Sequence, residues 1–396
     1  MSEPLAADHS AASGATSQPR VAVIGPTYPH RGGIAHYTTC LVSALTEAGC
    51  RTQVIAFRRL YPRWLFPGRN EFDPSQQSTQ VPSERILAPL NPLRWLAALR
   101  AIRHFSPDLV VVTWWHSWFL PCTVFCLLWL RWIQHRRVAL LCHNVRSHDH
   151  SAADTVAWPV LSRLPHTHIV HASGDPAQIR ARNPKARVIR LPHPIYEIFT
   201  DARVTREEAR RRLGLAPGDE VCLFFGLVRR YKGLDIAIEA LGTLTDRPNL
   251  RLLVAGEFYE PLDYYVRMIR RLRLTERVIL HDHYIPNEQV ALYFRAADVL
   301  LAPYRATSHS GVVQVARGFG LPVIASAVGG MSDLVSDGET GLLVAPADLK
   351  ALATAIARFF DQGLAARFRQ NYQLQKGMFS WSDLAQTIRR LACDSC

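Results

Sequence analysis

Acidic residues are scarce in this chain. Its 396 residues include 33 Asp and Glu against 46 Lys and Arg, which gives a formal net charge of +13. Such a surplus predicts an anionic partner: a nucleic acid, an acidic membrane surface or a phosphate-bearing small molecule. The arginine-rich stretches 206–212 and 267–273 lack the interleaved aromatic residues of single-strand-binding sheets. We therefore expect no nucleic-acid partner.

Cysteine is also sparse, and the sequence has no four-ligand zinc set. The eight cysteines are scattered, and neither Cys122 with Cys126 nor Cys393 with Cys396 completes such a set. The histidines and aspartate at 148–150 are interpreted as polar loop residues. Residues 1–19 are rich in alanine and serine and lack the basic start and apolar core of a signal peptide. We expect a disordered tail, reduced thiols, no metal and a cytoplasmic protein.

No apolar run is long enough to cross a membrane. The most apolar and aromatic stretch, 114–133, contains Pro121 near its start and Arg131 inside it, whereas a spanning helix needs about 20 predominantly apolar residues. Two interpretations stay open. The stretch is either a buried helix, or an interfacial helix with tryptophans at headgroup depth and arginines on acidic lipid. In the second case the protein is peripheral at the inner face of the cell membrane.

What the chain does have is a strand-then-helix alternation that occurs twice, which predicts parallel sheets covered on both faces. The expected strands of the first series are R-V-A-V-I-G (20–25), T-Q-V-I-A-F, D-L-V-V-V-T, R-V-A-L-L-C and T-H-I-V-H-A. The second series begins at Val221 and continues with L-R-L-L-V-A-G (250–256), R-V-I-L-H (277–281), D-V-L-L-A-P (298–303) and L-P-V-I-A-S (321–326).

The predicted fold class is α/β, with two Rossmann-like domains facing each other across a cleft. We expect the first domain over 20–195 and the second over 196–377, with a hinge in 191–218, where prolines precede a short charged helix. A last helix, at about 378–396, is expected to pack back on the first domain. Clefts between domains are preferred ligand sites.

Two glycine-containing loops favour phosphate. Gly32 and Gly33 precede a helix expected from about Ile34. Without side chains, their backbone N–H groups at the helix start are open to an anionic ligand. The spacing is not the G-x-G-x-x-G fingerprint, and the second strand ends without an acid, which disfavours a nicotinamide dehydrogenase.

In V-C-L-F-F-G-L-V-R-R-Y-K-G-L-D (221–235), a buried strand leads to Gly226, Arg229 and Lys232. This pattern predicts a phosphate grip at the carboxyl end of a strand. The alternative is a basic turn between surface elements.

Together these motifs resemble those of family-4 glycosyltransferases of the GT-B fold, and the similarity extends from residue 20 to about 379. The signs are G-G-I, F-G-L-V-R-R-Y-K-G-L-D, L-L-V-A-G-E (252–257), A-D-V-L-L-A-P-Y, S-G-V-V-Q, G-L-P-V-I-A-S-A-V-G-G and D-G-E-T-G-L-L-V (337–344). The resemblance implies that a sugar moves from a nucleotide-diphosphate donor with retention at the anomeric carbon and without a metal. It also implies that the nucleotide binds the second domain and the acceptor the first.

The same resemblance implies roles for single residues. Arg229 and Lys232 would hold the diphosphate and stabilise the charge that builds as the nucleotide leaves. Ser310, Gly311 and Val312 would offer backbone amides to the same group. In the other motifs, Ile285 would meet the base, Gly226 and Glu257 would line the nucleotide site, and Gly32 and Gly33 would lie under the donor sugar.

On the acceptor side, His143 in C-H-N-V resembles the histidine that related enzymes place beside the donor sugar. Its imidazole would orient a sugar hydroxyl, while the alternative is a histidine that caps a strand end. His116, at the end of the preceding strand, is a second candidate for this part of the site.

One departure concerns a pair of glutamates that the family has eight positions apart, the second of which grips the ribose. Thr307 and Val315 stand there, or Ser308 and Ala316 if the loop differs by one residue. Gln314 is the nearest polar group and is expected to accept a ribose hydrogen bond.

The sequence therefore predicts a retaining glycosyltransferase that uses a nucleotide-sugar donor and a lipid-linked or glycan acceptor. Two alternatives stay open: a non-catalytic nucleotide-sugar-binding scaffold and a GT-B-fold sugar-nucleotide epimerase. An epimerase needs acid and base carboxylates in the cleft, and the first domain offers few. A scaffold would bind the nucleotide without transferring the sugar.

Overall fold

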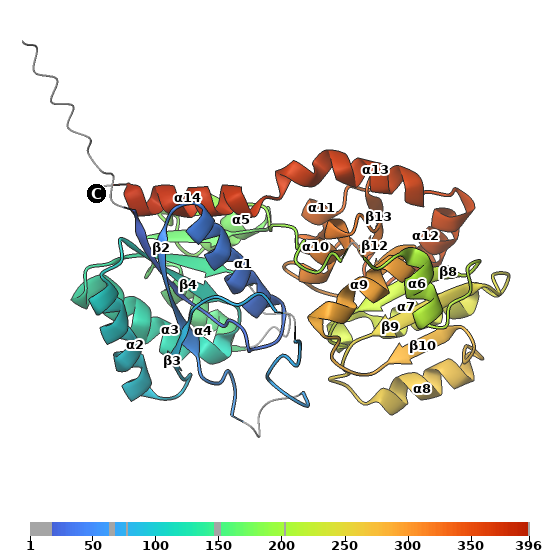
Figure 1. Cartoon of the computed structure of the whole chain (residues 1–396), viewed down its shortest axis with the longest axis horizontal. Coiled ribbons are helices and arrows are strands. Elements are labelled where there is room, and N and C mark those ends of the chain that lie inside the picture. Colours follow the sequence, from blue (N-terminus) through green and yellow to red (C-terminus); the bar gives the residue numbers. More distant parts are fainter. Residues whose placement is uncertain (1–17, 63–67, 77, 146–151, 202, 395–396) are drawn as a thin grey trace, which may run out of the picture.

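The apolar runs of both halves form parallel strands that helices cover on both faces (Figure 1). A run such as 109–114 is buried over its whole length, as expected of a strand inside such a sheet. The structure is a computed structural model that describes residues 18–62, 68–76, 78–145, 152–201 and 203–394. The predicted tail falls mostly outside these residues, as do the loop residues 148–150.

In the described residues, the first sheet has seven strands in the order β3-β2-β1-β4-β5-β6-β7. They are β1 (Arg20–Ile24), β2 (Arg51–Phe57), β3 (Glu84–Leu87), β4 (Leu109–Trp114), β5 (Arg137–Cys142), β6 (Thr167–Val170) and β7 (Val188–Arg190). Its helical elements are α1 (Gly33–Glu47), α2 (Pro92–Phe105), η1 (Ser117–Phe119), α3 (Leu120–Leu128), η2 (Trp129–Ile133), α4 (Ala152–Leu161) and α5 (Asp175–Arg180).

The second sheet has six described strands in the order β10-β9-β8-β11-β12-β13. They are β8 (Glu220–Phe225), β9 (Leu250–Ala255), β10 (Val278–His281), β11 (Val299–Ala302), β12 (Val323–Ser326) and β13 (Gly341–Val344). The helical elements around it are α6 (Arg206–Arg212), η3 (Arg230–Lys232), α7 (Leu234–Thr243), α8 (Leu262–Arg271), α9 (Asn287–Ala296), α10 (Gly311–Gly318), α11 (Met331–Leu334), α12 (Leu349–Asp361) and α13 (Ala365–Gln375).

Two segments connect the domains and bond to each other. Ile195 N donates to the Phe379 carbonyl at 3.1 Å, and the indole N–H of Trp381 donates to the Ile195 carbonyl at 2.8 Å. After η4 (Lys376–Met378), helix α14 (Trp381–Cys393) returns to the first domain and packs on α1 and β1 (Figure 1). Helix α14 thus belongs spatially to the first domain.

The apolar stretch 114–133 forms the end of β4, η1, α3 and the π-helical turn η2. One side of it is buried, with Cys126, Leu127 and Leu130 in the core, while Trp132 and Ile133 are 51% and 61% exposed. Within the described part of the chain, no helix has both the length and the apolarity needed to cross a bilayer.

In both sheets the strand order reverses direction along the chain at one point, between β1 and β4 and between β8 and β11. Parallel α/β sheets bind ligands outside the carboxyl ends of the strands at such a switch point. The loops that follow β1 and β8 carry Gly32 and Gly33, and Gly226, Arg229 and Lys232, respectively. The topology therefore brings both predicted glycine-containing loops to the cleft.

Candidate functional site

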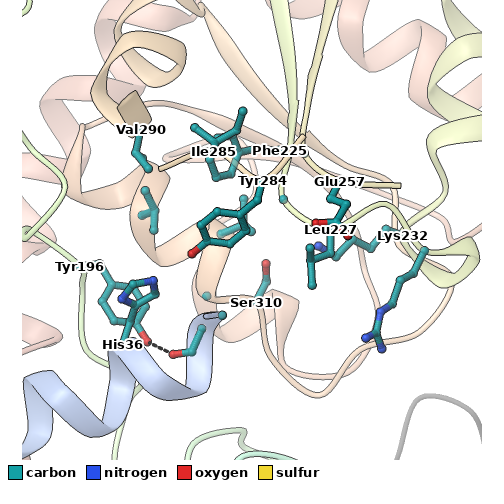
Figure 2. Close-up of a pocket in the computed structure, with 18 of the residues that line it drawn as sticks. His36, Tyr196, Phe225, Leu227, Lys232, Glu257, Tyr284, Ile285, Val290 and Ser310 are labelled. Carbon is teal, nitrogen blue, oxygen red and sulfur yellow. Dashed lines mark hydrogen bonds between the residues drawn. The ribbon is translucent and has the colours of Figure 1, made fainter. Parts of the chain in front are cut away.

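A cavity of about 280 Å³ lies between the domains and is lined by both of them (Figure 2). Its lining includes most of the sequence-predicted residues: Gly32, Gly33, Gly226, Arg229, Lys232, Glu257, Ile285, Ser310, Gly311 and Val312. We call it the first cavity.

The basic end of the first cavity is built by the loop after β8. Gly226 has φ 91°, and a Cβ there would lie 3.2 Å from Lys232 Nζ, so glycine keeps the lysine accessible. Burial, and then the nearby Arg229 charge, lower the pKa of Lys232 to about 7. Among the described residues, neither cation has a carboxylate partner, and the Arg229 guanidinium lies 4.9 Å from the Tyr259 ring centre. Two cations placed so favour an anionic ligand.

Helix α10 begins at the same end of the cavity. Ser310 caps it by accepting a hydrogen bond from Val313 N at 3.3 Å. Gly311 and Val312 belong to the first turn, so their amides have no partner inside the helix. Both residues line the cavity. An anion between Lys232 and this helix start would meet both a cation and the positive end of the helix dipole.

The opposite end of the first cavity is apolar. Figure 2 shows Phe225, Ile285 and Val290 gathered there, away from Lys232. Val315 also lines the cavity, one turn into α10. Val315, one of the two residues that can align with the second family glutamate, therefore gives this part of the cavity an apolar wall.

A second cavity, of about 340 Å³, adjoins the first and extends into the amino-terminal domain. Tyr196 fixes the loop between them, because its hydroxyl donates to the Gly33 carbonyl at 3.2 Å. His116 and His143 line the second cavity and not the first. The lining residues that both cavities share are Gly32, Gly33, Tyr196, Leu227, Arg229, Tyr231, His309 and Gly311.

His143 is held neutral. Burial and the neighbouring His193 and His309 lower its pKa to about 3, and its Nε2 is buried with no hydrogen-bond partner among the described residues. His171 completes the cluster, with its ring centre 6.1 Å from that of His143. A neutral imidazole can orient a hydroxyl group but cannot donate a proton as an acid at neutral pH.

Glu257 connects the two domains across the cleft. It accepts a hydrogen bond from Arg31 Nη1 at 2.6 Å in an ion pair whose side chains are 5% and 2% exposed. Its other oxygen accepts from Arg69 N at 2.6 Å. Glu257 therefore lines the first cavity while its carboxylate is held by the first domain.

The expectation for Gln314 was wrong in its geometry. The side chain is fully buried and lines neither cavity, and its amide nitrogen donates to the His193 carbonyl. The reason is the phase of α10: at 100° per residue, Gly311 and Val315 face the cavity while Gln314 turns toward the hinge. Gln314 therefore positions the connection between domains and does not reach a ligand.

Sequence reasoning missed the residues that depend on the closed arrangement of the domains. Arg31, Asp73 and Tyr284 belong to this group, and so do His193 and His309. One signal was available: His143 and His171 each lie just beyond the carboxyl end of neighbouring strands, β5 and β6, which pair in register. Within the described residues, no group of three or more His, Cys, Asp or Glu side chains is placed to hold a metal ion.

The carboxyl-terminal domain matches a known family. Residues 219–362 match the model described as glycosyl transferases group 1. This domain belongs to the group 1 glycosyl transferases. The predicted glycosyltransferase relationship is thereby confirmed for the domain that carries Arg229 and Lys232.

Curated relatives of the chain are glycosyltransferases by name. D-inositol 3-phosphate glycosyltransferase of Corynebacterium glutamicum is 34% identical over 232 residues, which are 57% of this chain and 54% of that protein. The lipopolysaccharide core biosynthesis mannosyltransferase LpsB of Rhizobium meliloti is 34% identical over 165 residues, 39% of this chain and 46% of that protein. The chain spans about half the length of these relatives.

Solved structures match over nearly the whole chain. Sucrose-phosphate synthase of Thermosynechococcus elongatus has a TM-score of 0.73 at 21% identity and covers 94% of this chain and 98% of its own. The Anabaena protein HepE, solved with UDP-glucose, has a TM-score of 0.74 at 19% identity and covers 93% of this chain and 98% of its own. These likenesses confirm the predicted GT-B fold.

Proposed function

We propose that the protein transfers a sugar, with retention, from a nucleotide-diphosphate sugar to a hydroxyl of a glycan or lipid-linked acceptor. The observation that carries this proposal is the pair Arg229 and Lys232. Both line the first cavity beside the start of α10 and, among the described residues, lack a carboxylate partner. A diphosphate supplies the missing negative charge at the place where the cations and the helix dipole converge.

In the proposed reaction, the bond between the anomeric carbon and the distal phosphate oxygen breaks, and its electron pair stays on the diphosphate. Lys232 and Arg229 stabilise that charge, without a metal ion. An acceptor hydroxyl in the second cavity forms the new bond on the same face of the sugar, and its proton passes to the departing phosphate. Neutral His143, which lines the second cavity, orients a sugar hydroxyl.

The lining carboxylates argue against the epimerase alternative. In the described part of the two cavities they are Glu257 and Glu71. Glu257 is bound to Arg31 and Arg69, and Glu71 accepts from Leu60 N at 3.3 Å. Both carboxylates are engaged by donors or cations of the first domain, which disfavours a role as acid or base at a sugar carbon.

A lipid-linked acceptor fits the outer surface of the first domain. Trp132 and Ile133 are exposed at the end of η2, and Leu93, on the neighbouring α2, is 77% exposed. With the net charge of +13, these side chains favour a peripheral position on an anionic membrane. We propose this location together with the acceptor class.

The first prediction separates the three functions. Purified protein incubated with UDP-, GDP- and ADP-sugars is expected to release one nucleoside diphosphate and to release it faster when a glycan or lipid-linked acceptor is added. The measurement is nucleotide release together with mass analysis of the sugar product. A scaffold would bind a nucleotide without release, and an epimerase would return an altered nucleotide sugar. Either result would replace the proposed transfer.

The second prediction concerns the uptake of a proton when a nucleoside diphosphate binds beside Lys232. Because the pKa of Lys232 in the free protein is about 7, this side chain is mostly neutral at about pH 8.5, and a bound diphosphate raises its pKa again. Binding of the accepted nucleoside diphosphate at that pH should take up close to one proton. Calorimetry in buffers of different ionisation enthalpy measures the uptake, and Lys232→Met should abolish it. An uptake that persists in the variant would assign the proton to another group.

A further inference from the structure

The apolar end of the first cavity determines how a donor's nucleoside is recognised, provided that the proposed nucleotide-sugar transfer is correct. A donor whose diphosphate lies between Lys232 and the start of α10 can extend its nucleoside toward the apolar end of this cavity. That direction leads to Phe225, Ile285 and Val290 (Figure 2). The ribose, which lies between the base and the diphosphate, then passes beside α10 and the side chain of Val315.

No carboxylate meets the ribose along this path. Among the described residues that line the first cavity, Glu257 is the one acid. It lies on the same side as Lys232 in Figure 2, and its oxygens accept from Arg31 and from Arg69 N, each at 2.6 Å. A ribose diol therefore finds no charged acceptor between the two ends.

The polar side chains at the apolar end are directed to Asp73 of the first domain. The Tyr284 hydroxyl donates to Asp73 Oδ2 at 3.2 Å, and the Asn287 amide donates to the same oxygen at 3.5 Å and to Ser78 Oγ at 3.0 Å. His36 Nε2 lies 3.9 Å from that oxygen. Tyr284 and Asn287 therefore line the cavity with their donor groups engaged by the first domain.

We propose that the donor site does not recognise the ribose 2′-hydroxyl, and that it takes 2′-deoxyribonucleoside diphosphate sugars as readily as their ribose counterparts. Val315 is the specificity-determining residue, because it presents methyl groups where a hydrogen-bond acceptor would distinguish the two sugars. A site built to bond a substrate hydroxyl rejects the analogue without it by about 10⁴- to 10⁵-fold. An apolar wall lacks this means of discrimination, and an unpaired hydroxyl beside it loses its bonds to water.

The test compares UDP with 2′-deoxy-UDP, and GDP with 2′-deoxy-GDP, by calorimetry on the full chain. These pairs differ only at the 2′ position. We expect dissociation constants within about threefold of each other, or tighter binding of the deoxy form, because no acceptor is lost. A preference of about 30-fold or more for ribose would overturn this inference and leave the proposed transfer intact. Absence of binding by every nucleotide would instead overturn the proposed transfer, and this inference with it.

A pair of variants tests the role of Val315 itself. Val315→Glu introduces a carboxylate and should create a ribose preference of about tenfold or more. Val315→Met introduces a side chain about as long as glutamate but without a carboxylate. This variant should leave the ratio of the ribose and deoxyribose dissociation constants unchanged. A folded Val315→Glu protein with an unaltered ratio would show that this residue does not face the ribose. If circular dichroism shows that Val315→Glu does not fold, the ratio of the wild-type protein decides the question.

Discussion

Replacing Lys232 by methionine is expected to lower kcat about 10²- to 10³-fold, the loss typical of removing one group that stabilises transition-state charge. The free protein should become no less stable, because Lys232 is only 8% exposed and lies near Arg229 without an acidic partner in the described structure. Methionine retains the apolar stem and removes the charge that burial disfavours. Activity and stability should therefore change independently.

The pH dependence supplies a check on this explanation. The pKa of Lys232 is lowered from 10.5 to about 7 in the folded protein, so between these values the unfolded chain binds more protons than the folded one. The contribution of Lys232 to the free energy of unfolding thus rises with pH between these values. Below about pH 7 the folded protein carries the full cost of burying the charged side chain. The stabilising effect of Lys232→Met should be largest near pH 6.5 and should shrink toward pH 10.

Melting temperatures at several pH values, together with kcat at saturating donor, measure both effects. Arg230→Met is the matched control, since Arg230 is the exposed cation of the same short helix η3. The control should keep its turnover and show no such pH dependence. Normal turnover in Lys232→Met would contradict the phosphate role of this residue.

The features that the sequence predicted well are local along the chain. Gly226, Arg229 and Lys232 stand within seven positions of each other after one buried strand, so their arrangement needs only that strand and the turn after it. The long apolar strands were also predictable, because burial on both faces leaves continuous apolar runs. The edge strands β3, β7 and β13 were missed because each has only three or four residues, and β3 and β7 are also partly exposed and contain charged residues.

The features that the sequence did not predict depend on distant pairings. Arg31 and Glu257 are 226 positions apart, and they meet only because the two domains close on each other. The role of Gln314 was misjudged because its direction depends on the residue at which α10 begins. Helix α10 begins at Gly311, and with this start Val315 faces the cavity while Gln314 does not. A start one residue later or earlier would turn a different side chain toward the cavity.

The second large effect is expected when the ion pair between the domains is broken. Arg31→Met leaves the carboxylate of Glu257, which is 2% exposed, without its charged partner. Removing one member of a buried pair costs about 3–5 kcal/mol. Because Arg31 and Glu257 belong to different domains, we expect this cost to weaken domain docking more than the fold of either domain. Thermal unfolding should separate into two transitions, and the radius of gyration from X-ray scattering should increase.

Two controls distinguish burial from the mere presence of charges. Arg69 and Asp282 also join the domains at 2.6 Å, but the arginine is 67% exposed, and exposed pairs contribute about 0–1 kcal/mol. Arg69→Met should therefore leave the single transition and the radius of gyration nearly unchanged. The double variant Arg31→Met with Glu257→Met should recover most of the docking, because apolar residues of similar volume replace buried pairs at little cost. Equal behaviour of Arg31→Met and Arg69→Met would mean that burial does not strengthen this contact.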